Sequence, residues 1–189
     1  MERLTAGFAM CGSFCTFSKV ISELKGLSDN MNVIPIMSYE AAKTDTRFGK
    51  AEDFIDNLEK ITGNSVIKTI KDAEPIGPQK LLDILIVAPC TGNTLGKLAN
   101  GIFDTPVTLA VKSHLRNKRP VLIAVSTNDA LGISAKNIGQ LMNSKHIFFV
   151  PMKQDDADNK PNSIVADFNL ISDAVSYALQ NKQIQPVYK

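Results

Sequence analysis

Small polar residues follow four apolar segments of the sequence, at the point where each apolar segment ends. These four exits are Cys11-Gly12-Ser13, Ser38, Cys90-Thr91-Gly92-Asn93-Thr94 and Ser126-Thr127-Asn128. Glycine lets backbone N–H groups approach an anion closely, and the start of a helix adds a favourable dipole. Because the first and third exits both precede helical patterns, they predict a site where two turns on neighbouring strands hold one phosphate group. Taken alone, the Gly7 to Ser13 turn is equally compatible with an ordinary tight turn.

Other catalytic patterns are missing from the sequence. The turn at Gly12 lacks the lysine of a nucleotide-hydrolase loop, and no G-x-G-x-x-G fingerprint or G-x-S-x-G elbow is present. Cys11, Cys15 and Cys90 all fall near the predicted site, so a thiolate nucleophile or a metal site is conceivable. The two histidines, at positions 114 and 146, are far from these cysteines in sequence. We therefore favour buried packing roles for the cysteines and expect no metal.

Strands and helices are predicted to alternate along the chain. Continuous apolar runs predict strands at 4–10, 33–37, 84–88, 120–126 and 147–150, with a short one at 66–69. Period-3.6 patterns predict helices at 14–25, 50–61, 95–100, 107–117, 130–143 and 167–181. Fully apolar strands that alternate with helices are typical of an α/β fold with a doubly wound, mostly parallel, Rossmann-like sheet. Ligands of such sheets bind outside the carboxyl ends of the strands, which is where the four polar exits lie.

The remaining segments are predicted to be irregular. Residues 72–80, with two prolines and a glycine, are expected to form a loop, and Pro89 is expected to end the strand at 84–88. The polar segment 154–163 predicts a loop or a flap that faces a partner, and 183–189 a tail. The length of 189 residues is compatible with a single domain that covers the whole chain.

The overall composition excludes several classes of protein. A formal net charge of +2 is close to neutral, and the one dense basic run, 114–119, is typical of a solvated helix end, so nucleic acid is not an expected partner. No leader sequence and no membrane-spanning window are recognised. Three cysteines do not suggest a disulfide framework, so we expect a cytoplasmic protein with reduced thiols.

Residues 88–104, APCTGNTLGKLANGIFD, carry a specific resemblance. They resemble the P-A-S-A-N-T…K-x-A-N-G-I-x-D signature of the homo-oligomeric flavin-containing cysteine decarboxylase superfamily. The resemblance extends weakly to 7–13, Ser38 and 120–128, and thus covers most of the predicted sheet. It implies a flavoprotein-type three-layer sandwich over residues 1–189 and a homo-oligomer, either a trimer or a dodecamer built from trimers.

The resemblance also implies roles for the residues of the four exits. Gly12 and Ser13 would bind the phosphate of FMN, and Ser38 would lie near the ribityl chain or the ring. Ser126 and Asn128 would lie toward the isoalloxazine and the substrate, with Asn128 in the position of a catalytic asparagine. The phosphate would also be bound at the third exit, by Thr91, Gly92, Asn93 and Thr94. Because Cys90 and Gly92 replace other small residues of the flavin loop, a site for only a phosphate-like group remains an alternative to FMN.

Four segments resemble one branch of the superfamily in particular, the B subunit of a two-subunit oxidoreductase of spore formation. These segments are 88–94, 116–120, 125–132 and 154–163. This resemblance implies oxidation of a dihydro precursor to the aromatic pyridine-2,6-dicarboxylate, together with an A subunit that carries NADP. A dicarboxylate requires amide or cationic donors. Asn128, Arg47 and Lys112 are the candidates, and only Asn128 has motif support.

Two other functions remain open. One is a stand-alone FMN-dependent decarboxylase of a cysteinyl or other thiol compound. The superfamily's decarboxylases carry a histidine shortly before the strand at 84–88, whereas the first histidine here is His114, which argues against that reaction. The other is a flavin fold that has lost catalysis and serves as a scaffold for the A subunit.

Overall fold

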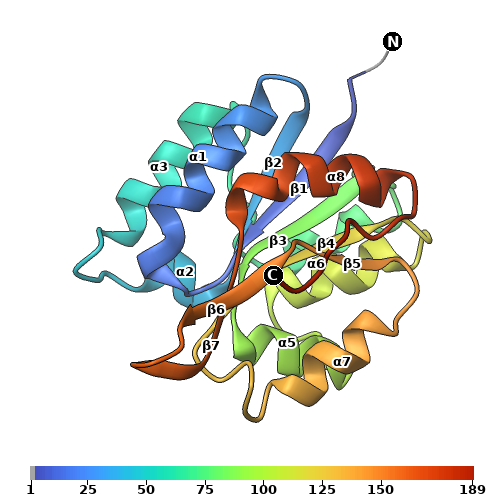
Figure 1. Ribbon diagram of the computed structural model, residues 1–189. Coiled ribbons are helices and arrows are strands. Elements are labelled where there is room, and N and C mark those ends of the chain that lie inside the picture. Colours follow the sequence, from blue (N-terminus) through green and yellow to red (C-terminus); the bar gives the residue numbers. More distant parts are fainter. Residues whose placement is uncertain (1–2) are drawn as a thin grey trace.

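The computed structural model describes residues 3–189, which form a mostly parallel sheet between two layers of helices (Figure 1). Seven strands are seen in this part of the chain: β1 Thr5–Met10, β2 Asn32–Met37, β3 Ile84–Cys90, β4 Val121–Thr127, β5 Ile147–Phe149, β6 Met152–Asp156 and β7 Lys160–Ala166. The α-helices are α1 Phe17–Ser28, α2 Tyr39–Lys43, α3 Ala51–Thr62, α4 Ile70–Ala73, α5 Gly92–Ala99, α6 Pro106–Leu115, α7 Ala135–Met142 and α8 Ile171–Leu179. Three short 3-10 helices are η1 Phe14–Thr16, η2 Glu74–Ile76 and η3 Phe168–Leu170.

The five parallel strands are arranged in the order β2-β1-β3-β4-β5. From β1 the chain moves outward to β2, and it then crosses back to place β3 on the other side of β1. The order therefore reverses between β1 and β3. In open α/β sheets this reversal leaves a crevice at the carboxyl ends of the two strands. The predicted doubly wound α/β fold is confirmed, and the topology itself indicates where a ligand binds.

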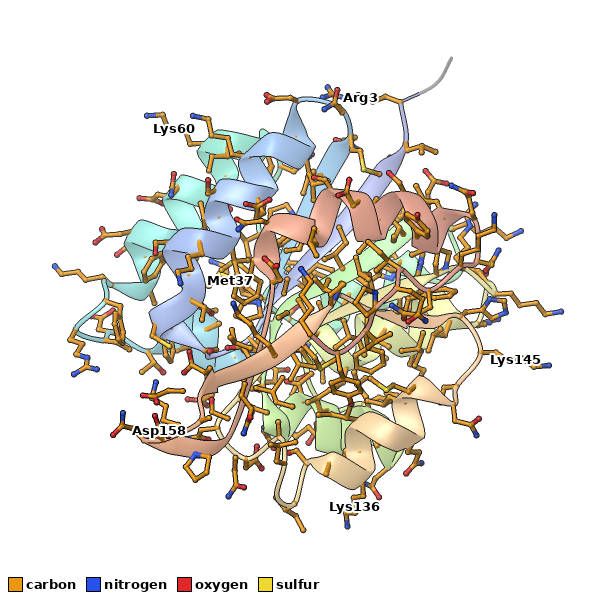
Figure 2. The ribbon with its side chains drawn as sticks, viewed as in Figure 1. Arg3, Met37, Lys60, Lys136, Lys145 and Asp158 are labelled. Atoms are coloured by element: carbon orange, nitrogen blue, oxygen red, sulfur yellow. The ribbon has the colours of Figure 1, made fainter. Side chains whose placement is uncertain are left out.

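Alternate residues of the central strands face opposite layers of helices. Phe8 and Met10 of β1 pack toward α1 and α8, whereas Ala9 and Cys11 pack toward the layer formed by α5, α6 and α7. Both sets are buried, which explains why the strands read as continuous apolar runs. Figure 2 shows Met37 inside the molecule and charged side chains such as Lys60 and Asp158 at its periphery.

The segment 154–163, predicted as a loop or a flap that faces a partner, forms most of a β-hairpin, so the loop alternative was wrong and the role as a flap stays a prediction. β6 pairs antiparallel with β7, and β7 joins the sheet by pairing Ser126 with Val165 and Thr127 with Ile164. The Asp156 carboxylate closes the turn by accepting hydrogen bonds from the backbone N–H and side-chain amide of Asn159. Most residues of the hairpin from 153 to 162 are exposed to solvent, so the segment lacks the apolar alternation from which strands are recognised.

Three other expectations were wrong in detail. Residues 70–76, placed mostly in a loop, form α4 and η2, because Thr69 caps α4 through the Asp72 N–H (3.1 Å) and the helices bury Ala73 and Ile76. β3 does not end at Pro89 but continues through a cis Ala88–Pro89 bond to Cys90, with a shift in register after Val87. α7 begins at Ala135 rather than near 130, because turns occupy 128–134.

The tail at 183–189 is held against the sheet by several contacts. The Gln183 side chain accepts a hydrogen bond from the Phe149 N–H (2.7 Å) and donates one to its carbonyl (2.7 Å). Met152 exchanges backbone hydrogen bonds with Val187 and Lys189. The short strand expected at 66–69 is reduced to one parallel bridge between Ile67 and Ile36.

Candidate functional site

A cavity of about 800 Å³ lies at the carboxyl edge of the sheet, at the crevice between β1 and β3. Its volume is in the range of small-molecule and cofactor sites. Residues from three of the four predicted exits line it. They are Gly12, Ser13, Thr91, Gly92, Asn93, Ser126, Thr127 and Asn128. The parallel strands thus bring together residues that are more than 100 positions apart in sequence.

Two hydroxyl groups meet across the floor of this cavity. Ser13 follows β1 and Ser126 lies near the end of β4, and their Oγ atoms are 2.9 Å apart. β3 lies between these two strands, so the pair spans its carboxyl end. A hydroxyl is both donor and acceptor, so the pair can turn its protons toward a bound oxygen.

The amino end of α5 supplies backbone donors to the same cavity. Thr91 is the N-cap residue, but its side chain does not cap the helix. The first N–H groups of a helix have no partner within it, so those of Gly92 and Asn93 are available to a ligand. These donors lie where the sequence predicts a phosphate site, and phosphate binding by them stays a prediction.

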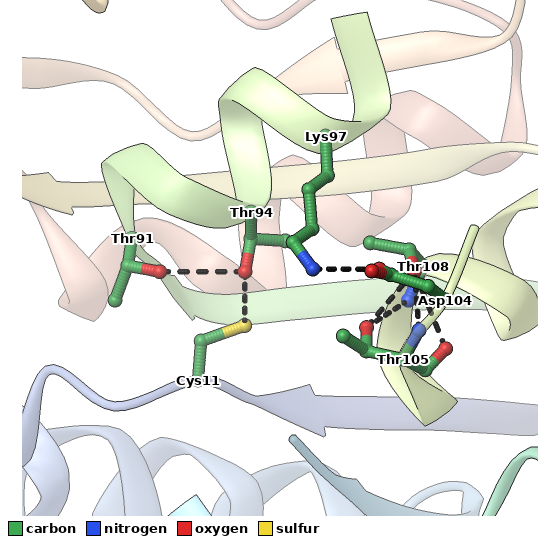
Figure 3. A network of polar contacts seen from close by, with 7 residues as sticks. All are labelled: Cys11, Thr91, Thr94, Lys97, Asp104, Thr105 and Thr108. Carbon is green, nitrogen blue, oxygen red and sulfur yellow. Dashed lines mark hydrogen bonds and ion pairs between the residues drawn. The ribbon is translucent and has the colours of Figure 1, made fainter. Parts of the chain in front are cut away.

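Ser38 and Thr94 have other contacts in the structure. Ser38 is the N-cap of α2, where its Oγ accepts a hydrogen bond from the Ala41 N–H (3.3 Å). Thr94 is buried, and its hydroxyl donates to the Cys11 sulfur (3.3 Å) and accepts from the Thr91 hydroxyl (3.3 Å), as Figure 3 shows. Neither residue lines the cavity, so their direct contacts with a ligand stay predictions.

Gly92 packs against a cluster of three oxygen-bearing side chains. The Asp129 carboxylate accepts hydrogen bonds from the hydroxyls of Thr127 and of Ser134 (2.9 Å to the latter). A Cβ atom on residue 92 would lie 2.6 Å from Asp129 Oδ1, 2.8 Å from Thr127 Oγ1 and 2.9 Å from Ser134 Oγ. This close approach requires glycine and joins the 127–134 turns to the start of α5.

The three cysteines divide into a buried pair and an exposed thiol. Contact with the Cys90 thiol lowers the pKa of Cys11 despite burial, with a further contribution from the Thr94 hydroxyl. Burial is the main cause that raises the pKa of Cys90 well above its ordinary value, and Cys11 adds to it. Cys15, by contrast, is exposed and lines the cavity. The prediction of buried packing roles fits Cys11 and Cys90 but not Cys15.

The outer rim of the cavity carries charged and aromatic residues, most of which the sequence did not single out. Arg47, an expected candidate, lines the cavity together with Phe14, Lys19, Phe48, Asp155 and Lys160. Lys112 does not line it, and its ammonium instead lies 5.1 Å from the centre of the Phe103 ring. Lys160 pairs with Asp155 at 2.8 Å. The hairpin therefore forms one wall of the cavity.

The residues that line the site are chemically compatible with a phosphate-bearing, planar cofactor. The floor offers hydroxyl and backbone N–H donors for a phosphate, and Phe14, Ile164 and Val165 offer apolar surface for a ring. Within residues 3–189 no group of three or more His, Cys, Asp or Glu side chains is placed to hold a metal ion. No helix in this same range combines the length and apolar character needed to cross a bilayer.

Ion pairing and capping stabilise the segment that follows α5. Lys97 pairs with Asp104 at 2.6 Å, and Thr105 forms a reciprocal capping box with Thr108 at the start of α6 (Figure 3). These contacts hold the turn at 100–105 and thereby the ends of both helices. Several residues of the sequence signature at 88–104 therefore hold the ends of α5 and α6 in place rather than line the cavity.

Comparisons with known proteins agree with this geometry. A family model described as Flavoprotein matches residues 1–179. The chain is 42% identical over 182 residues to the B subunit of dipicolinate synthase from Bacillus subtilis, covering 96% of this chain and 91% of that protein. The crystal structure of the B subunit of dipicolinate synthase from Bacillus halodurans superposes with a TM-score of 0.90 at 38% identity, covering 100% of this chain and 98% of that one. An FMN-dependent cysteine decarboxylase, SpaF, has a TM-score of 0.64 at 20% identity over 94% of this chain and 97% of its own, a likeness of fold alone.

Proposed function

The chain belongs to the Flavoprotein family, and we propose that it is the B subunit of a dipicolinate synthase. In this proposal it acts with an NADP-binding A subunit to oxidise dihydrodipicolinate to dipicolinate during spore formation. The observation that carries the proposal is 42% identity over nearly the whole chain to the B subunit of a dipicolinate synthase, combined with an intact cavity at the strand exits.

Dehydrogenation of the substrate removes a hydride and a proton and makes the ring aromatic. NADP⁺ on the A subunit is the proposed acceptor of the hydride, and water or a side chain takes the proton. This chain would hold the dicarboxylate with its ring at the strand exits. Asn128 is the proposed catalytic group, because its exposed side-chain amide lines the cavity and makes no hydrogen bond within the described residues.

FMN is the proposed cofactor of this chain. Gly12, Ser13 and the start of α5 would hold its phosphate, and Ser126 would face the ring side of the cavity. When bound, FMN supplies a centre that accepts or donates two electrons. A phosphate-like group alone is the alternative occupant.

We further propose a homo-oligomer, either a trimer or a dodecamer, as in the superfamily that the sequence resembles. The three free thiols are compatible with the reducing cytoplasm, where we place the enzyme. Light scattering of the purified chain measures the oligomeric state directly.

Reconstitution tests the proposed function. The two purified subunits are mixed with dihydrodipicolinate and NADP⁺, and the formation of NADPH and of dipicolinate is followed. We expect the rate to rise as this chain is added until the two subunits are equimolar, and each of them to be slow or inactive by itself. Full activity of the isolated A subunit would contradict a role for this chain.

A stand-alone decarboxylase is less well supported by the site. His114 is buried on α6 against the Pro120 carbonyl, and His146 lies beside Asn181, so neither histidine lines the cavity. Release of carbon dioxide from a cysteinyl substrate by this chain alone would nevertheless establish that activity.

A further inference from the structure

A tight turn at 46–49 presents an arginine and an aromatic ring side by side at the rim of the cavity. Thr46 and Gly49 exchange backbone hydrogen bonds of 3.0 and 3.1 Å, which leaves Arg47 and Phe48 at the tip. The Arg47 guanidinium carbon lies 4.9 Å from the centre of the Phe48 ring. Both side chains line the cavity.

This turn is held in place by contacts on both sides of its tip. The Thr46 hydroxyl accepts a hydrogen bond from the Phe48 N–H (3.1 Å), and the Asp45 carboxylate accepts one from the Ala51 N–H (2.9 Å). Gly49 has a φ of +145° and lies so close to Phe54 that a Cβ would be 2.8 Å from that ring. The turn is thus pre-organised, which reduces the entropy lost on binding.

The turn is connected to Phe14, a residue that lines the cavity, by packed aromatic rings. Phe54 packs edge-on against Phe17 at 5.0 Å, and Phe17 lies 5.2 Å from Phe14, which lines the cavity. Helix α1 therefore sets the position of the turn relative to the strand exits.

Two cations of this rim have no anionic partner within residues 3–189. Arg47 and Lys19 form no ion pair, whereas Lys160 across the cavity is paired with Asp155. The Phe48 side chain is 46% exposed to solvent. A ligand ring packed against it would bury apolar surface, which favours binding. Two unpaired cations and an exposed ring that line one cavity suit a planar molecule with two carboxylates.

We propose that the 46–49 turn is the substrate-recognition element of the cavity. Arg47 binds one carboxylate of a planar dicarboxylate, Phe48 covers its ring, and Lys19 binds the second carboxylate. Arginine suits the first role because its planar fork matches a carboxylate with two parallel hydrogen bonds. This inference rests on the proposed function, in which this chain rather than the A subunit holds the dicarboxylate.

Calorimetric titration tests the inference on the full chain. Pyridine-2,6-dicarboxylate and the monocarboxylate pyridine-2-carboxylate are titrated into wild-type, Arg47→Gln, Arg47→Lys and Phe48→Leu proteins. Lys50→Gln is the matched control, because Lys50 is an exposed cation next to the turn but outside the cavity. Thermal unfolding of each variant verifies that it is folded.

We expect Arg47→Gln to weaken dicarboxylate binding by about 10- to 100-fold, the effect of one charge-assisted hydrogen-bonded pair. The preference for the dicarboxylate over the monocarboxylate should shrink by a similar factor. Arg47→Lys should be intermediate, and Lys50→Gln should match the wild type. In the reconstituted enzyme, Arg47→Gln should raise KM and leave kcat within about threefold, because Arg47 holds a carboxylate rather than the reacting carbon.

Each alternative outcome has a defined meaning. Equal affinities of Arg47→Gln and Lys50→Gln would overturn the inference, as would loss of FMN binding in Arg47→Gln without loss of dicarboxylate binding. An active two-subunit enzyme in which this chain binds no dicarboxylate would also overturn it; the reaction assigned to the two subunits would stand, with the substrate held by the A subunit. Arg47-dependent dicarboxylate binding in an enzyme without dehydrogenase activity would support the inference and overturn the proposed function.

Discussion

The hydroxyls of Ser13 and Ser126 meet at 2.9 Å across the end of β3 and join the first and fourth strands at the floor of the cavity. Of the two, Ser126 is the more buried, with 7% of its surface exposed. The floor therefore offers a fixed pair of hydroxyls beside the free N–H groups of α5. A ligand oxygen placed there receives donors from three separate strand exits.

Replacement of Ser13 by alanine is expected to weaken FMN binding. The change removes one donor to the phosphate and leaves the Ser126 hydroxyl without its partner, at a cost of about 1–2 kcal/mol, or about 5- to 30-fold in affinity. Quenching of flavin fluorescence measures this affinity. Ser18→Ala, an exposed serine on α1, should bind FMN like the wild type, and equal affinities for Ser13→Ala and Ser18→Ala would contradict the role of the pair.

Replacement of Gly92 by alanine should destabilise the protein, although alanine is the better helix former. Gly92 is the first residue of α5, so the helix propensity gain is at most about 1 kcal/mol. The new Cβ would lie 2.6–2.9 Å from three side-chain oxygens that are hydrogen-bonded to one another, and overpacking of this kind costs about 1–3 kcal/mol. Gly139→Ala in α7 is the control of opposite sign, since nothing lies within 4 Å of its Cβ position, and should stabilise by up to about 1 kcal/mol. Urea unfolding measures the free energy of unfolding of both variants. A Gly92→Ala protein more stable than the wild type would contradict the close packing of residue 92 against the three side chains.

Ligand binding should protect Cys15 from modification. Cys15 is exposed and lines the cavity, whereas Cys11 and Cys90 are buried. A thiol reagent should thus modify one of the three cysteines rapidly, and a saturating ligand of the cavity should slow that reaction. Peptide mapping identifies the modified residue. Unchanged labelling of Cys15 at saturating ligand would show that the ligand binds elsewhere.

His114 should make the protein less stable at acidic pH. Burial, the largest cause, lowers the pKa of His114 to about 4, while its Nε2 lies 3.0 Å from the Pro120 carbonyl and its Nδ1 has no hydrogen-bond partner among residues 3–189. The unfolded chain takes up a proton near pH 6.5 and the folded chain only near pH 4. The contribution to stability is therefore complete above pH 6.5 and is lost as the pH falls toward 4, by a total of about 3 kcal/mol.

The free energy of unfolding in urea between pH 7 and pH 4.5 measures this loss. His114→Gln should flatten the pH dependence, and His146→Gln, the other histidine, should keep it. The same slope in wild type and His114→Gln would assign the acid sensitivity to other groups.

The positions of the strand exits could be predicted because their cause is local. Apolar runs such as 84–88 indicate buried parallel strands, and the carboxyl ends of parallel strands share one edge. The convergence of Ser13, Thr91 and Ser126 followed from that rule. Thr94 and Ser38 were harder to place, since a hydroxyl at a helix start can equally serve the helix or a neighbouring thiol.

The rim of the cavity could not be predicted, because its position depends on tertiary packing. Phe48 reaches the site because Phe54 packs against Phe17 of α1, a contact that leaves no local pattern in the sequence. Lys19 projects from α1 itself. The wall formed by Asp155 and Lys160 depends on a hairpin whose polar strands resemble a loop.

The cavity of this chain, in our central proposal, takes part in the reaction of a two-subunit enzyme. The most direct measurement is the rate of NADPH formation by the A subunit reconstituted with this chain, either wild type or Asn128→Ala. Asn143→Ala, an exposed asparagine at the end of α7, is the matched control. We predict a loss of kcat of at least about tenfold for Asn128→Ala and none for Asn143→Ala. An unchanged rate with Asn128→Ala would contradict the proposal and identify the chain as a scaffold for the A subunit.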